Sequence, residues 1–169
     1  MLYKSSLCKL ALISISFFLV SACTETNDIT EVKSNAVLLD VYKGRECSCC
    51  AKWITHVREN GLFTESHSES YVDLNQTKDE YGIPKNLRSC HTSVSKDGFV
   101  FEGHIPAKFI KKYLNEKPEG TFGLAVPAMP TGSPGMEFGE MFTPYTIYLL
   151  KNDGSLEVFA KVEKIEEQF

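Results

Sequence analysis

Three cysteines lie within four residues, at Cys47, Cys49 and Cys50, and they are the side chains best suited to chemistry. Cys47 and Cys50 alone form a CxxC pair, which suits thiol–disulfide exchange. The third thiol complicates that use, because a three-thiol cluster can reshuffle its disulfide and a bond between adjacent cysteines would be strained. Three sulfurs in so short a segment suit a soft metal ion better than a simple dithiol switch.

The segment before the cysteines predicts a strand, and the segment after them predicts a helix. Residues 36–43 are a nearly continuous apolar run of strand length. From Cys50 onward, apolar residues such as Trp53 and Val57 follow a helical spacing that ends near Gly61. The cysteines therefore lie where a strand passes into a helix, and the amides and dipole of the helix N-terminus stabilise a thiolate there.

The remaining pattern predicts an α/β protein in which the elements follow the order of a thioredoxin-like fold, with an added C-terminal β-hairpin. An Asp-Gly pair, typical of a tight turn, separates the two strands of each predicted hairpin. The predicted elements are a strand at 63–72, a short helix at 75–81, a hairpin of 91–95 and 99–101, an amphipathic helix from Pro106, and a second hairpin of 145–151 and 155–162.

A second group of metal-ligating residues follows from that order. Cys90 and His91 begin the strand that faces the cysteine loop in a thioredoxin-like arrangement, where thioredoxins normally have a cis-proline. His104 ends the other strand of the same hairpin. Thiolate, thioether and imidazole groups together are the ligand set that Cu(I) prefers, and histidines also accept Cu(II). His56 and His67 lie outside these motifs, and we assign them to no site.

A stretch rich in glycine, proline and methionine, residues 123–141, cannot form one regular element. So long a loop is unusual in a compact domain unless it has a function. Met136 follows a Ser-Pro-Gly turn that no core would need, and it is the first candidate for a thioether ligand. Met129 is the second candidate, and we interpret Met141 as a packing residue.

The N-terminus is typical of a bacterial lipoprotein. Lys4 and Lys9 precede an apolar run, residues 10–20, that is too short to span a membrane but suits a secretory signal. The sequence VSAC resembles a lipobox, so we expect cleavage before Cys23 and acylation of its sulfur; ordinary signal cleavage is the alternative. Thr24, rather than an aspartate, follows and favours the outer membrane. We expect a signal peptide at 1–22, a lipidated N-terminus and polar tether at 23–35, and a thioredoxin-like metal-binding domain at 36–169.

Composition limits the classes of partner. The chain has 169 residues, of which 43% are hydrophobic and 24% are charged, and this fits one globular domain. Eighteen Lys and Arg against twenty-two Asp and Glu give a net charge of -4, so we expect no nucleic-acid partner. Export would place the cysteines in an oxidising compartment, where thiols form disulfides or bind metal.

Four motifs in order resemble the CopG-like family of periplasmic copper-binding proteins, also called domain of unknown function 411. The motifs are CSCCAKW from Cys47, SCHTSV from Ser89, FEGHIP from Phe101 and GLAVPAMPTGSPGM from Gly123, and the resemblance spans roughly residues 37–162. It implies a thioredoxin-like fold, a place in copper resistance, and a cysteine-bridged copper cluster of more than one ion, with redox cycling of copper as a further expectation. The ligands that it implies are Cys47, Cys49, Cys50, Cys90, His91, His104 and a loop methionine, either Met136 or Met129.

The predicted function is a lipid-anchored, periplasm-facing protein that binds copper ions for copper resistance and works with a copper-export or redox partner. Its status as an enzyme stays open, with a binding role favoured. A competing interpretation is a thiol–disulfide oxidoreductase that uses Cys47 for attack and Cys50 for resolution, although the missing proline before Thr92 counts against it. The cysteines would also be consistent with a purely structural disulfide, or with a zinc or iron–sulfur site.

Overall fold

The structure is a computed structural model that describes residues 37–169. One mixed sheet of seven strands, in the order β2-β1-β3-β4-β5-β6-β7, runs through this part of the chain. The pairs β1/β2 and β4/β5 are parallel, and the other neighbours are antiparallel. The strands are β1 (Leu38–Gly44), β2 (Phe63–Glu69), β3 (His91–Ser95), β4 (Val100–Glu102), β5 (Thr121–Ala125), β6 (Tyr145–Lys151) and β7 (Leu156–Val162).

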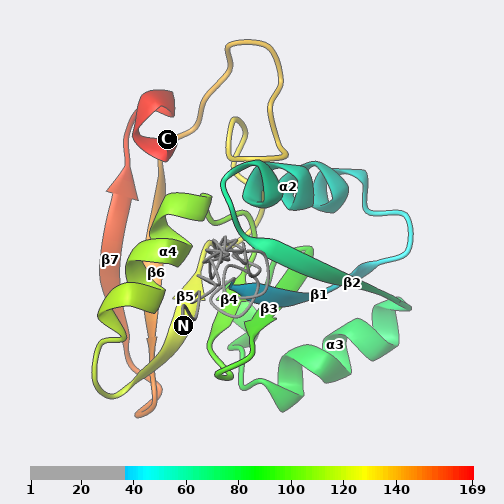
Figure 1. Ribbon diagram of the computed structural model, residues 1–169, viewed down its shortest axis with the longest axis vertical. Helices are drawn as coiled ribbons and strands as arrows, with labels where there is room; N and C mark the ends of the chain where they lie inside the picture. The colour runs from blue at the N-terminus through cyan, green and yellow to red at the C-terminus, as the bar shows by residue number, and fades with distance from the viewer. Residues whose placement is uncertain (1–36) are drawn as a thin grey trace, which may run out of the picture.

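Three α-helices cover this sheet. In Figure 1, β1 and β2 lie between α2 and α3, and α4 lies in front of β5 and β6. Residues of α2 and α4 belong to the same hydrophobic cluster as the buried residues of β1. The helices are α2 (Ser48–Glu59), α3 (Tyr71–Glu80) and α4 (Ala107–Glu116), with the short 3₁₀ helices η1 (Lys85–Leu87) and η2 (Ile165–Gln168).

A tryptophan in the core ties α2 to the end of β4. Trp53 is fully buried, as the helical spacing of apolar residues after Cys50 predicts. Its indole Nε1 donates a hydrogen bond of 2.8 Å to the carbonyl oxygen of Ile105, the residue after His104. A buried indole normally needs such a partner, and here the partner fixes the helix that carries the cysteines against the chain that carries His104.

The mixed α/β class and both predicted hairpins agree with the structure, but three predicted boundaries were wrong. The strand predicted at 63–72 ends at Glu69, because α3 begins at Tyr71. The helix predicted at 75–81 begins at Tyr71, because Ser70 caps it and its hydroxyl accepts a 3.2 Å hydrogen bond from the amide of Asp73. The sequence of this helix is too polar for apolar periodicity to reveal its first turn.

The loop predicted at 123–141 was also placed too early, because its first three residues belong to β5. Gly123 reads as a loop residue in the sequence, but it lies where β5 approaches β4 most closely. A Cβ atom on Gly123 would lie only 1.8 Å from the carbonyl oxygen of Val100. The glycine therefore permits a close contact between strands.

Several predictions concern residues outside the described part of the chain. The signal peptide at 1–22, the acylated Cys23 and the tether at 23–35 all lie there. Within residues 37–169, no helix is long and apolar enough to cross a membrane.

Candidate metal centre

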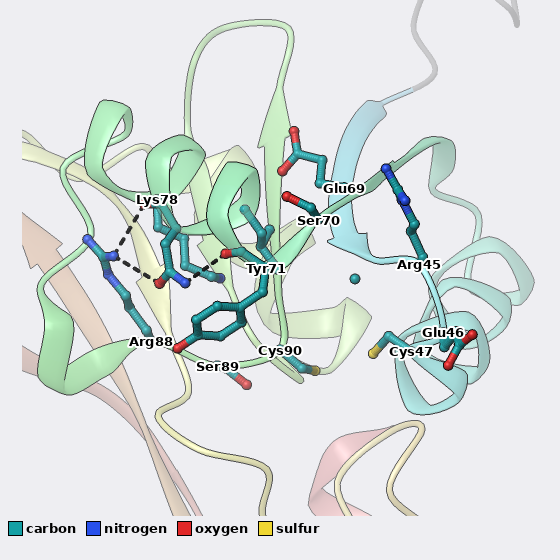
Figure 2. Close-up of a pocket in the computed structure, with 13 residues that line it drawn as sticks. Arg45, Glu46, Cys47, Glu69, Ser70, Tyr71, Lys78, Arg88, Ser89 and Cys90 are labelled. Carbon is teal, nitrogen blue, oxygen red and sulfur yellow. Dashed lines mark hydrogen bonds between the residues drawn. The ribbon is translucent and has the colours of Figure 1, made fainter.

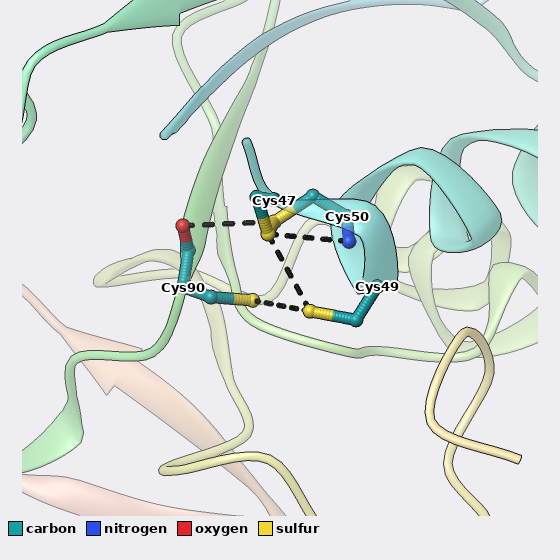
Figure 3. A group of neighbouring side chains, drawn as sticks. All are labelled: Cys47, Cys49, Cys50 and Cys90. Atoms are coloured by element: carbon teal, nitrogen blue, oxygen red, sulfur yellow. Dashed lines mark hydrogen bonds between the residues drawn. A yellow bond between two sulfur atoms is a disulfide. The ribbon is translucent and has the colours of Figure 1, made fainter. Parts of the chain in front are cut away.

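The cysteine segment begins α2, as predicted. Cys47 is the N-cap residue, and its Sγ accepts a 3.3 Å hydrogen bond from the amide of Cys50. Cys47 and Cys50 form a disulfide, which Figure 3 shows at the start of the helix. Cys50 is completely buried, whereas Cys47 is partly exposed. The CxxC pair is thus oxidised, with one sulfur in the core and one near the surface.

Two free thiols extend this group across to β3. Cys49 Sγ lies 3.4 Å from Cys47 Sγ and 3.9 Å from Cys90 Sγ. Cys90 immediately precedes β3, which pairs with β1 so that His91 is opposite Lys43. The sulfurs of Cys47, Cys49, Cys50 and Cys90 all lie within 4.8 Å of one another (Figure 3). Four sulfurs within that distance can ligate a common soft metal ion once the disulfide is reduced.

Cys90 also belongs to a second group, formed with two buried histidines. Its Sγ lies 2.9 Å from His104 Nε2 and 3.4 Å from His91 Nδ1. His104 Nδ1 lies 2.8 Å from the carbonyl oxygen of Pro134, so this nitrogen carries the hydrogen and Nε2 keeps a free lone pair. The other nitrogen of His91, Nε2, is buried with no hydrogen-bond partner. Both rings can therefore act as metal ligands without breaking a hydrogen bond to the rest of the protein.

The surroundings set the protonation states of these groups. Burial lowers the pKa of His91 and of His104, so both rings are neutral at neutral pH. Burial, followed by the nearby Cys49 thiol, raises the pKa of Cys90 to about 12. The imidazoles can thus bind a metal ion directly, whereas the Cys90 thiol must first lose its proton.

Sequence reasoning missed a buried ion pair behind the site. Lys78 Nζ lies 2.6 Å from Glu102 Oε1 and donates a 2.8 Å hydrogen bond to Thr92 Oγ1. The Thr92 hydroxyl donates to Glu102 Oε2 at 2.6 Å, and the Ser89 amide donates to Glu102 Oε1 at 2.5 Å. The side chains of Lys78 and Glu102 are only 3% and 0% exposed. Through these hydrogen bonds the network holds Ser89 and Thr92, the residues on either side of the Cys90-His91 pair.

The loop after β5 packs against the first turn of α2. A Cβ atom on Gly135 would lie 2.6 Å from the carbonyl oxygen of Cys49 and 2.8 Å from the amide nitrogen of Trp53, so only glycine fits there. Gly135 also has a φ of +87°, which favours glycine. Met136 follows directly and is partly buried, whereas the side chain of Met129 is 46% exposed. Met136 therefore stays the better candidate for a thioether ligand, and its role stays a prediction.

The structure gives His56 and His67 roles outside these groups. His56 is partly buried, and its Nε2 accepts a 3.1 Å hydrogen bond from the Ala107 amide at the start of α4. His67 Nε2 lies 2.8 Å from Asp40 Oδ1 on the surface of β1 and β2.

Comparisons with known proteins find one family model and two solved structures that are similar to this chain. A family model described as "Protein of unknown function, DUF411" matches residues 87–136, which include Cys90, His91, His104 and the loop methionines Met129 and Met136. Two solved structures named "Copper resistance protein copG", Form 1 and Form 2, are each 38% identical to this chain, with a TM-score of 0.70. Each alignment covers 75% of this chain and 98% of the solved chain. No curated protein matches.

Proposed function

The chain belongs to the DUF411 family of CopG-like proteins, and from this premise we propose that it handles copper by binding Cu(I) at the cysteine and histidine groups described above. The observation that carries the proposal is the position of Cys90, which belongs both to the four-sulfur group and to the group with His91 and His104. A thiolate can bridge two metal ions, so two groups that share one thiolate suit a cluster better than a single ion. The solved relatives are named for copper resistance, which supports copper as the metal.

Each side chain has a distinct part in this proposal. Cys47 and Cys49 supply thiolates at the N-terminus of α2, where the helix dipole favours negative charge. Cys50 supplies a further thiolate on the buried side of the site. His91 and His104 supply neutral imidazoles and also allow Cu(II) to bind. Met136, or else Met129, adds a thioether from the loop. A thioredoxin-like core is part of the same proposal, supported by the strand order β2-β1-β3-β4 and by α2 joining β1 to β2.

Copper loading should depend on the redox state of the protein. A disulfide sulfur is a poor metal ligand, and the Cys47–Cys50 bond withdraws two of the four thiolates. We expect the phosphine-reduced protein, freed of reductant under anaerobic conditions, to bind more than one Cu(I) per chain, and the oxidised protein to bind fewer. Titration against a chromophoric Cu(I) chelator measures both numbers. Equal stoichiometry in the two forms would contradict the use of these thiolates.

Copper affinity should also rise with pH. The pKa of Cys90 is raised to about 12, so this thiol keeps its proton in the metal-free protein at neutral pH and must release it on binding. Each proton released makes binding about tenfold tighter per pH unit. His91 and His104 release none, because burial already holds both rings neutral. Chelator competition between pH 6 and 8 should therefore give a positive slope of at least one, and a flat profile would count against Cys90 as a ligand.

We also propose that the protein is held in the cell envelope by a lipid on Cys23, as the lipobox-like VSAC predicts. The solved relatives are named for copper resistance, and their names give no location. Wild-type protein expressed in a bacterium should sediment with membranes and carry diacylglyceryl mass on its N-terminal peptide. Cys23→Ala should lack that lipid mass. A wild-type N-terminal peptide without the diacylglyceryl mass would exclude this anchor.

A thiol–disulfide oxidoreductase is the second candidate function, because the Cys47–Cys50 disulfide has one partly exposed sulfur. An insulin-reduction assay on copper-free protein separates the two functions. Turnover that copper leaves unchanged would favour the enzyme, whereas no turnover above that of the Cys47→Ser variant would leave copper binding as the function.

A further inference from the structure

A pocket of about 710 Å³ opens beside the disulfide. It is bounded by the turn between β1 and α2, by the first two turns of α3, and by the segment that precedes β3 (Figure 2). Cys47 and Cys90 form part of one wall, with their sulfurs on the same side of the pocket. The pocket therefore brings solvent, and any small molecule within it, to the edge of the sulfur group.

The two ends of the disulfide differ in their access to this pocket. Cys47 lines the pocket and is partly exposed, whereas Cys50 does not line it and is completely buried. A thiolate that arrives through the pocket can thus reach Cys47 Sγ but not Cys50 Sγ. The hydrogen bond from the Cys50 amide to Cys47 Sγ also stabilises Cys47 as a departing thiolate in a later step.

We propose that this pocket is the binding site of a small zwitterionic thiol that reduces the Cys47–Cys50 disulfide and so prepares the protein for copper. Its thiolate attacks Cys47 Sγ, a mixed disulfide forms, and Cys50 leaves as a thiolate that takes up a proton. A second thiol then attacks the sulfur of the bound molecule, forms the small-molecule disulfide, and releases Cys47 as a thiolate. Two thiols are oxidised and one protein disulfide is reduced.

The size and charges of the pocket indicate this class of reductant. A volume of about 710 Å³ is in the usual range for small-molecule sites. Arg45 on the wall can pair with a carboxylate, and Glu46 and Glu69 can pair with an ammonium group. Lys78 and Arg88 also line the pocket, but their charges are engaged by Glu102 and Asp79. Charges of both signs favour a molecule that carries both, such as an amino-acid thiol.

Gly44 allows the pocket to be filled without disturbing the sulfurs. It lines the pocket, and a Cβ atom added to it would meet no atom within 4 Å. We expect Gly44→Trp to slow the reduction of the oxidised full-length protein by L-cysteine at least tenfold. Ser66→Trp, an exposed position on β2 outside the pocket, is the matched control and should react at the wild-type rate. Rates come from timed quenching with iodoacetamide and mass spectrometry, with near-UV circular dichroism to check folding.

The same quenched samples give a second readout that needs no variant. In wild-type protein, the trapped mixed disulfide should carry L-cysteine on Cys47. Finding it on Cys50, a Gly44→Trp rate within twofold of wild type, or reduction by a polypeptide dithiol alone would overturn the proposal.

This inference rests on the proposed copper function, but the two can fail separately. Wild-type protein reduced by a phosphine, and then given Cu(I), tests copper binding without the pocket. If that protein binds copper while Gly44→Trp reacts normally with L-cysteine, only the role of the pocket is wrong. If the reduced protein binds no copper, the copper function itself is wrong.

Discussion

Replacing Cys90 with serine is expected to weaken Cu(I) binding by at least about 100-fold and to leave no more than one ion per chain. Loss of a residue that merely orients a metal ligand already costs about 10- to 100-fold in affinity. Loss of the Cys90 thiolate should lower the copper affinity further, because its sulfur belongs to the four-sulfur group and also lies 2.9 Å from His104 Nε2. Its removal leaves three sulfurs in one group and two imidazoles in the other. Chelator competition on the reduced protein measures the affinity and the number of ions.

A matched pair of histidine variants shows whether the loss is specific. His104→Gln removes one ligand of the group that contains Cys90 and should lower the stoichiometry. His67→Gln changes a histidine on β2 that belongs to neither group, and it should bind copper as the wild type does. Wild-type affinity in Cys90→Ser, or equal losses in the two histidine variants, would contradict a site built around Cys90.

Lys78→Met is expected to destabilise the fold by about 3–5 kcal/mol, because it leaves the Glu102 carboxylate buried without its cation. That carboxylate is 0% exposed, so water cannot replace the lysine. Chemical denaturation in urea measures the free energy of unfolding. Lys85→Met, on the exposed side of η1, is the surface control and should change it by less than about 0.5 kcal/mol.

Adding Glu102→Gln to Lys78→Met should recover part of that loss. Glutamine removes the unpaired charge but keeps an oxygen that can accept from the Ser89 amide, which now donates to Glu102. The double variant should therefore be more stable than the sum of the two single changes indicates. If the two changes in unfolding free energy were strictly additive, or if Lys78→Met destabilised the fold by less than about 1 kcal/mol, the Lys78–Glu102 pair would not support the segment that carries Cys90.

Family membership and much of the fold could be predicted from local patterns. The helical spacing after Cys50 and the Asp-Gly hairpins are short-range signals. They predicted that Cys47 lies at the start of a helix and that Cys90 and His104 lie at the ends of hairpin strands. The proximity of Cys90 to the cysteine turn follows from strand order, because β3 is the neighbour of β1 in the sheet. The DUF411 resemblance was confirmed by the family model and the two solved structures.

Other features depend on contacts that no local pattern contains. Lys78 lies in a polar helix and looks like a solvent-exposed residue, and it is buried only because Glu102, 24 residues later, meets it inside the fold. Gly123 looked like a loop residue because its close contact with Val100 involves a strand that is distant in sequence. The choice of Cys47 and Cys50 as the disulfide pair depends on geometry at the helix N-terminus, which spacing alone left open among the three cysteines.

The most direct test is copper-edge X-ray absorption on reduced, Cu(I)-loaded wild-type protein with the metal content measured in parallel. We expect more than one copper per chain, a first shell dominated by sulfur with a smaller imidazole contribution, and copper–copper scattering from thiolate-bridged ions. A shell of nitrogen and oxygen alone, or protein that retains no copper after reduction, would contradict the central claim that these cysteines and histidines form one copper site.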